Sequence, residues 1–145
     1  SNPGARTFVY FANESEITRF MCAELRQAGA VCYAIVGDAM QTSGLPDRIV
    51  CHRRFCGFVE AKKNKNPLSG PQRARFEELR ARGGCALVAR YSWSDKARCW
   101  RARFRAHDET VIGPFVSLKK GCGTALVDAL ELTWRDVSAA SGRRS

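Results

Sequence analysis

The sequence predicts an α/β fold, a mixed β-sheet flanked by helices, with an appended C-terminal hairpin and helix. Segments of helical period at residues 13–28, 69–82 and 123–134 alternate with short runs rich in Val, Ile, Phe and Tyr. The strand-like runs come singly and in hairpin pairs between the helices, which is typical of a mixed sheet. The chain has 145 residues, 45% of them apolar, so one domain can bury a sizeable core.

The N-terminal elements are expected in the order strand, helix, strand, loop. Residues 7–11 predict a short first strand. Asn13 or Ser15 caps a helix that runs to about Ala28, and Gly29 ends it. Residues 31–36 predict a strand and residues 37–46 a loop. The apolar face of the helix consists of Ile17, Phe20, Met21 and Leu25.

A hairpin follows, with strands at residues 48–52 and 55–61 and a turn at Arg53 and Arg54. With this turn, His52 pairs with Phe55, and the same register places Asp47 opposite Glu60. The period of two along a strand then puts Lys62 on the same face as Glu60.

The C-terminal half begins with a capping box, in which Ser69 and Gln72 have the S-x-x-Q spacing. That helix runs to about Arg82 and is followed by a strand at residues 85–91. Residues 97–106 and 110–118 predict a second hairpin, and residues 123–134 a final helix. Residues 136–145 read as a flexible tail, so a single domain covers residues 1–135.

Charge and cysteine usage indicate a DNA-binding protein of a reducing, intracellular compartment. Lys and Arg number 24 against 14 Asp and Glu, a net charge of +10, which favours a nucleic-acid partner. The seven cysteines are an odd number scattered through apolar segments, which favours reduced thiols over a disulfide framework. No apolar run is long enough to span a membrane, and no secretory signal is recognisable.

The facing carboxylates of Asp47 and Glu60 predict a metal site. Directly opposed residues have Cβ atoms about 5 Å apart, where two like charges repel, and a hard divalent cation relieves this repulsion. Asp47, Glu60 and the carbonyl of Ala61 would hold Mg²⁺ or Mn²⁺, and Lys62 would orient water or neutralise charge on a phosphate. Alternatively, Asp47 is only a turn residue after Pro46, and Lys62 belongs to a solvated loop.

These motifs resemble the VRR-NUC branch of the PD-(D/E)XK nucleases over about residues 13–91. The resemblance rests on Gly-x-Pro-Asp, then Glu-x-Lys, then a Gln that opens a helix ending in Gly. In this chain the matching residues are Gly44, Pro46, Asp47, Glu60, Lys62, Gln72 and Gly83. The resemblance implies a restriction-endonuclease-like core and, for stand-alone members, homodimers acting on branched DNA such as Holliday junctions, as in DNA repair.

The resemblance also implies roles for single residues. Asp47 and Glu60 would be metal ligands, with the carbonyl of Ala61, and Lys62 the catalytic lysine. Gln72 would be a helper near the site, although the capping box already accounts for it. A glutamate of the first helix would reach the metal, and Glu14 is preferred over its rival Glu16.

DNA is expected on a strand that reads WRARFR. Arg101, Arg103 and Arg105, here called the arginine row, share one face and can follow phosphates. Alternatively, the row protects a sheet edge from aggregation. Lys63 and Lys65 would grip the backbone beside the cut.

The sequence therefore predicts a Mg²⁺- or Mn²⁺-dependent endonuclease. The alternatives are a non-catalytic basic DNA-binding module on a nuclease fold and a basic structural protein. The apolar stripe of the last helix is expected in the core or in a dimer interface.

Overall fold

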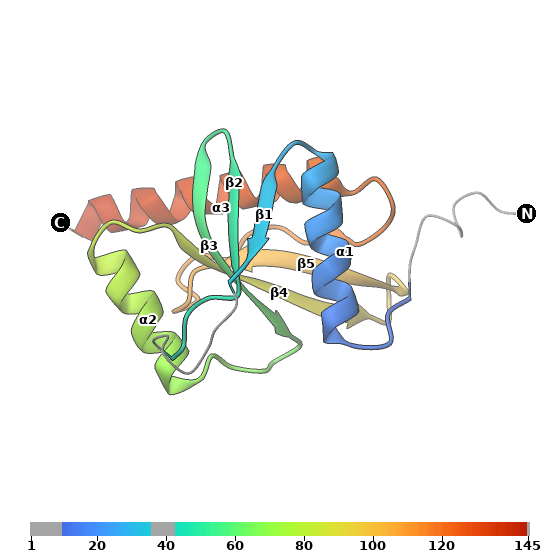
Figure 1. Cartoon of the computed structure of the whole chain (residues 1–145), viewed down its shortest axis with the longest axis horizontal. Helices are drawn as coiled ribbons and strands as arrows, with labels where there is room; N and C mark the ends of the chain where they lie inside the picture. The colour runs from blue at the N-terminus through green and yellow to red at the C-terminus, as the bar shows by residue number, and fades with distance from the viewer. Residues whose placement is uncertain (1–9, 36–42, 145) are drawn as a thin grey trace, which may run out of the picture.

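The computed structural model describes residues 10–35 and 43–144, which form a six-stranded sheet and three helices (Figure 1). The strands lie in the order β1-β2-β3-β4-β5-β6. The architecture is mixed α/β, as predicted. The strands are β1 (Val31–Ala34), β2 (Arg48–His52), β3 (Phe55–Lys63), β4 (Ala86–Ser94), β5 (Cys99–Arg105) and β6 (Val116–Ser117), and the helices are α1 (Glu14–Gln27), α2 (Gly70–Ala81) and α3 (Gly123–Arg144).

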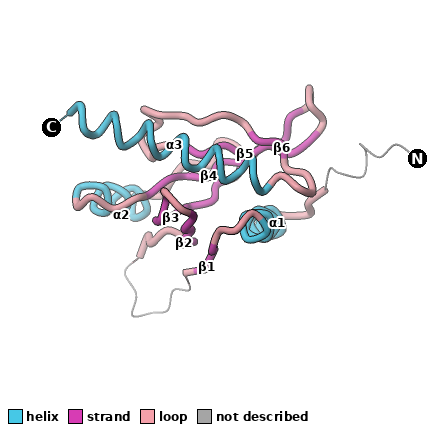
Figure 2. The backbone as a smooth tube through the Cα atoms, turned by 90° about the horizontal axis from the view of Figure 1, so that it is seen from above, coloured by secondary structure: helices cyan, strands magenta, loops and turns pink. Residues whose placement is uncertain are grey.

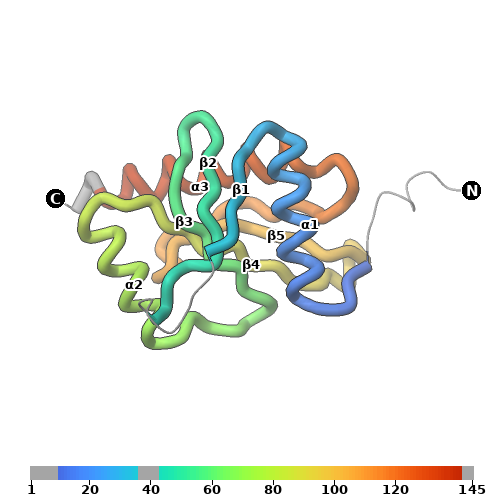
Figure 3. The backbone as a smooth tube through the Cα atoms, in the orientation of Figure 1, coloured from blue at the N-terminus to red at the C-terminus, as the bar shows by residue number. Residues whose placement is uncertain are grey.

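The sheet is mixed because β3 and β4 pair in parallel, whereas the other neighbouring strands described pair antiparallel. Helix α2 connects the parallel pair, as a crossover requires. The β2–β3 hairpin and β1 lie between α1 and α2 in the chain trace (Figure 3). This arrangement places the ends of β3 and β4 next to each other.

The two faces of the sheet are covered differently. The larger core packs one face against α1 and α3, through buried residues such as Val59, Leu87 and Phe104. Figure 2 shows α3 running alongside β4 and β5. The smaller core packs the other face against α2, through Phe76 and Val88. Beyond α2, this second face is open at the arginine row.

The predicted first helix is confirmed, because Asn13 caps α1 by accepting a hydrogen bond from the backbone N–H of Glu16 at 3.0 Å. The strand expected at residues 7–11 falls partly outside the described residues, and Tyr10 and Phe11 are not in a strand. The loop expected at residues 37–46 is described only from residue 43 onward.

The second predicted hairpin, of residues 97–106 with residues 110–118, is confirmed in its pairing, because β5 pairs antiparallel with β6. The prediction missed a further hairpin, because β4 continues to Ser94 and pairs with β5 through a turn at residues 95–98. The segment that returns after β5 contains only the two-residue strand β6 and a bridge between Arg105 and Ile112. Because β5 lies between β4 and β6, the arginine row is not on a sheet edge, and that alternative is wrong.

The flexible tail expected at residues 136–145 is instead helical as far as Arg144. Val137 is 1% exposed and belongs to the larger core. Arg80 of α2 also donates a hydrogen bond to the hydroxyl of Ser141 at 2.7 Å. Packing therefore extends the helix ten residues beyond the predicted end at Trp134.

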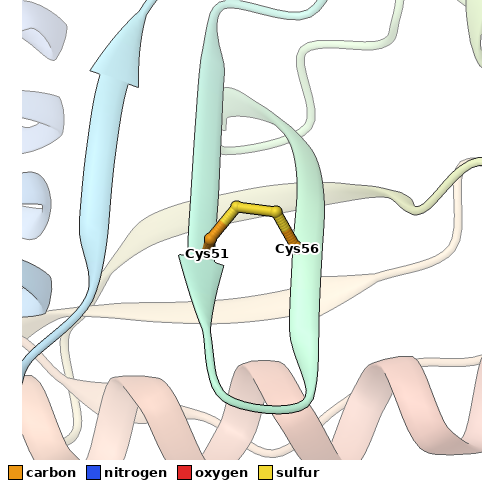
Figure 4. The surroundings of a disulfide bond; sticks show 2 residues. All are labelled: Cys51 and Cys56. Carbon is orange, nitrogen blue, oxygen red and sulfur yellow. A yellow bond between two sulfur atoms is a disulfide. The ribbon is translucent and has the colours of Figure 1, made fainter.

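The expectation that all cysteines are reduced is wrong for one pair. Cys51 of β2 and Cys56 of β3 form a disulfide near the turn of the hairpin (Figure 4). The other five cysteines are free, and two of them, Cys22 and Cys32, bring their sulfur atoms to 2.7 Å in the core. Within residues 10–35 and 43–144, no helix has the length and apolar character needed to cross a membrane.

Candidate active site

The β2–β3 hairpin has the predicted register. His52 pairs with Phe55, and Arg48 pairs with Val59. Arg53 in the turn has a φ of 44°, the left-handed conformation that a two-residue hairpin turn requires. One step beyond Arg48 and Val59, Asp47 lies opposite Glu60, and the backbone N–H of Ala61 donates to Oδ2 of Asp47 at 3.5 Å.

Both carboxylates are held where their negative charge is disfavoured. Glu60 is 6% exposed, and its pKa rises to about 7 because of burial and then because of the nearby charge of Asp47. Burial also raises the pKa of Asp47, although the Arg48 guanidinium opposes the shift. A cation placed between the two oxygens would remove this penalty.

One atom of the pair gives a direct test of whether a metal fits. Oδ1 of Asp47 is buried and has no hydrogen-bond partner. A buried carboxylate oxygen without a partner is costly, and carboxylate and carbonyl oxygens are the ligands that Mg²⁺ and Mn²⁺ prefer. Within the described residues, no three His, Cys, Asp or Glu side chains converge to hold a metal, at this pair or at any other place. The residues present therefore fit a cation held by two carboxylates, a backbone carbonyl and water.

The loop before Asp47 is fixed by Gly44. Gly44 has a φ of +83°, and a Cβ atom there would lie 2.4 Å from the carbonyl of Pro71 and 2.7 Å from the backbone nitrogen of Gln72. Only glycine allows this close approach, so the loop packs directly on the first turn of α2. The position of Asp47 thus depends on that contact.

Gln72 lies at this contact, but its side chain has a structural partner. Its Oε1 accepts from the backbone N–H of Ser69 at 2.9 Å, and the Ser69 hydroxyl accepts from the backbone N–H of Gln72 at 3.2 Å. The predicted capping box is therefore present. The helper role implied for Gln72 stays a prediction.

The two candidate glutamates of α1 have different surroundings. Glu14 lines a cavity of about 510 Å³ together with Thr18, Asp47 and Arg48. Its charge contributes to the raised pKa values of Asp47 and Glu60. Glu16 accepts from the backbone N–H of Ala12 at 2.6 Å instead. Of the two glutamates, Glu14 is thus the one that shares a cavity with Asp47, and its role as a metal ligand stays a prediction.

Lys62 and the arginine row share one face of the sheet. Ala61, Ala89 and Phe104 belong to the larger core, so their alternating neighbours face the other way. Lys62, Arg90 and Arg103 are aligned across three adjacent strands by the registers of β3–β4 and β4–β5. The candidate catalytic lysine thus begins a line of cations.

This line leads into a cavity of about 850 Å³, which we call the basic hollow. Phe115 forms one wall, and the guanidinium carbons of Arg101 and Arg103 lie 3.8 and 4.3 Å from the centre of its ring. The lining residues are Asn64, Lys65, Pro67, Arg90, Ser92, Arg103, Arg105, Glu109 and Phe115. Burial and neighbouring guanidinium groups lower the pKa of Arg103, so an anion in the basic hollow would be stabilised.

Arg90 is a site residue that the sequence did not reveal. Its Nη1 donates to the backbone carbonyls of Asn64, at 2.5 Å, and Asn66, at 2.8 Å. It thereby holds the loop that follows Lys62 against the basic hollow. No turn links β3 to β4, so the alignment of Arg90 with Lys62 could not be read from the sequence.

The two lysines expected to grip DNA together are separated. Lys65 lines the basic hollow, on the side of the arginine row. Lys63 faces the opposite side of the sheet, where its Nζ lies 5.6 Å from the ring centre of Trp100.

Comparisons with known proteins do not assign a family. No family model matches the chain, and no curated protein matches it. Among solved structures, the chain is similar to Archaeoglobus fulgidus Hjc, a Holliday junction resolvase from an archaeal hyperthermophile, with 23% identity and a TM-score of 0.46. The match covers 61% of this chain and 74% of the resolvase chain. At this level of similarity, the function has to be argued from the site itself.

Proposed function

We propose that the chain is a Mg²⁺- or Mn²⁺-dependent endonuclease that hydrolyses DNA phosphodiester bonds. The observation that carries the proposal is the buried Asp47–Glu60 pair, with an oxygen that lacks a partner, beside Lys62. The basic hollow on the same face supplies a surface for the phosphate backbone.

Each residue of the site has a separate task. Asp47, Glu60 and the Ala61 carbonyl would hold the metal, with Glu14 reaching it directly or through water. Such a metal polarises the scissile phosphate and lowers the pKa of bound water. Lys62 stabilises the charge that develops on the phosphate or orients the attacking water, because its ammonium lies on the face that the arginines share. The arginine row and Lys65 hold the backbone beside the cut.

A preference for branched DNA, including Holliday junctions, is part of the proposal and rests on the motif resemblance. A homodimer that acts inside the cell, in DNA repair, belongs to the same proposal. The Cys51–Cys56 disulfide removes the support that reduced cysteines would give to a reducing compartment, so the intracellular setting rests on the motif resemblance.

The metal is tested by calorimetric titration of Mn²⁺ into the wild type, Asp47→Ala and Asp136→Ala. Asp136 is an exposed acid of α3 and serves as the matched control. We expect Mn²⁺ affinity in the wild type and the control, and its loss in Asp47→Ala. Equal affinity in all three proteins would refute the metal site.

The activity is tested by incubating plasmid, linear and four-way-junction DNA with and without Mn²⁺. Cleavage that needs Mn²⁺ and disappears in Asp47→Ala, while DNA binding persists, is the expected result. The second candidate is a non-catalytic DNA-binding module, favoured by the basic hollow, which is built without Asp47 and Glu60. Salt-sensitive DNA binding without Mn²⁺ binding or cleavage would establish that candidate instead.

A further inference from the structure

Five aromatic side chains cluster at the end of the sheet where β3 and β4 finish. We call them the aromatic cluster: Tyr10, Phe11, Phe20, Trp93 and Trp100. The rings of Trp93 and Trp100 meet edge to face across β4 and β5, with their centres 6.0 Å apart, and the centre of the Tyr10 ring lies 6.4 Å from that of Trp93. Phe11 contacts both Phe20 and Trp100, at 5.4 and 6.3 Å, which anchors the cluster to α1.

The cluster exposes rings rather than burying them. Tyr10 is 82% exposed and Trp93 is 36% exposed, whereas Trp100 is half-buried below them. A cluster that only closed the core would hide its largest rings, because apolar surface is stabilised by removal from water. Tyr10 and Trp93, whose rings are tilted by 31° to each other, therefore form an aromatic surface open to a ligand.

A cation beside the rings indicates what the ligand is. Nζ of Lys63 lies 5.6 Å from the centre of the Trp100 ring. An aromatic surface beside a cation suits a nucleotide, because the rings stack on the base and the ammonium attracts the phosphate. The net charge of +10 adds a general attraction for nucleic acid.

The position of the cluster relative to the candidate active site is specific. Lys62 and Lys63 are consecutive in β3, so they face opposite sides of the sheet. Lys62 is the first cation of the line toward the basic hollow, and Lys63 lies next to the aromatic cluster. The basic hollow and the aromatic cluster thus lie on opposite faces of the sheet, and each is approached from a lysine near Glu60.

We propose that the aromatic cluster with Lys63 binds unpaired bases, and that the preferred substrate is forked DNA with a splayed strand beside the cut. The inference rests on the proposed nuclease function. The paired arm contributes phosphates to the basic hollow, and the splayed strand stacks its bases on Tyr10 and Trp93. A fully paired duplex presents no free base faces, so it gains only the first of these contacts.

The test measures binding of the full chain without metal, so that no cleavage occurs. The probes are a single-stranded oligonucleotide, a forked duplex and a fully paired duplex of the same sequence, each fluorescently labelled. The variants are Trp93→Leu, Trp93→Phe and Tyr10→Ser. The matched control is Leu132→Ser, because Leu132 is 38% exposed and lies on α3, away from both surfaces.

We expect Trp93→Leu to bind the single strand and the fork about 10-fold more weakly, since base stacking on an aromatic ring contributes on this scale. Its affinity for the paired duplex should match that of the wild type. Trp93→Phe should restore most of the loss, and Leu132→Ser should lose nothing. The oligonucleotide should also quench tryptophan fluorescence in Trp134→Phe, which keeps only the two clustered tryptophans.

Melting curves show whether each variant is folded. Tyr10→Ser is a second control for unfolding, because a side chain that is 82% exposed does not support the core. The inference would be overturned if Trp93→Leu lost equal affinity for the fork and the duplex, or if neither Trp93→Leu nor Tyr10→Ser lost affinity for the fork. Such a result leaves the nuclease intact if the wild type still cleaves DNA with Mn²⁺. Conversely, fork-selective binding without any cleavage would retain the stacking site and refute the nuclease.

Discussion

Replacing Glu60 with Gln should stabilise the metal-free protein at neutral and alkaline pH. In the unfolded chain Glu60 titrates near its ordinary pKa of 4.5, whereas in the folded protein burial and Asp47 raise the pKa to about 7. Between these values the folded state binds the proton more tightly. The contribution of Glu60 to the free energy of unfolding is therefore fully present below pH 4.5 and is lost as the pH rises through 7.

The size of this effect follows from the two pKa values. One pKa unit corresponds to about 1.4 kcal/mol, so ionising buried Glu60 costs the folded protein ~3 kcal/mol at pH 8. Glutamine has the same shape and no charge. Glu60→Gln should equal the wild type at pH 4 and exceed it by up to ~3 kcal/mol at pH 8.

Urea unfolding from pH 4 to 8.5 in EDTA measures the difference, with Glu77→Gln on the exposed side of α2 as the control. Adding Mn²⁺ at pH 8 should then stabilise the wild type and the control, because a ligand that binds only the folded state raises the free energy of unfolding. It should not stabilise Glu60→Gln. If Glu60→Gln were less stable than the wild type at pH 8 without metal, the reasoning would be refuted, because the charge of Glu60 would then be stabilised by its surroundings.

Three further changes separate the parts of the site. Lys62→Ala should abolish cleavage and keep Mn²⁺ affinity, because an ammonium is not a metal ligand; lost Mn²⁺ binding in calorimetry would contradict this. The triple Arg→Gln variant of the arginine row should flatten the plot of log affinity against log salt by about 0.9 for each lost phosphate contact, and an unchanged slope would place the DNA elsewhere. Gly44→Ala should lower the melting temperature and weaken Mn²⁺ binding, because its Cβ would meet the Pro71 carbonyl at 2.4 Å; wild-type behaviour in both assays would show that the loop can shift.

The part of the site within one hairpin could be predicted from the sequence. The turn at Arg53 fixes the register of β2 and β3, and strand periodicity then places Asp47, Glu60 and Lys62. The same periodicity predicted the common face of the arginine row. Local geometry was enough because each of these relations lies within one strand or across one short turn.

Relations between distant segments could not be predicted in this way. The alignment of Arg90 with Lys62 depends on a parallel pairing across α2, for which no turn sets the register. The extension of α3 to Arg144 depends on contacts of Val137 and Ser141 with other elements, which outweigh the weak helix propensity of a Ser- and Gly-containing end. The register of the hairpin places Cys51 opposite Cys56, but the odd number and the scatter of the cysteines argued against a disulfide.

The parallel pairing of β3 with β4 also bears on how the molecule folds and opens. The β2–β3 and β4–β5 hairpins each close over a short loop, whereas the seam between them joins segments separated by the whole of α2. Short loops close quickly and distant pairings form late, so the two hairpins are expected to form before the seam. Asp47, Glu60 and Lys62 lie with the first hairpin and the arginine row lies on the second. Amide hydrogen exchange at the β3–β4 pairing would therefore measure how often the hairpin with the candidate catalytic residues separates from the hairpin with the arginine row.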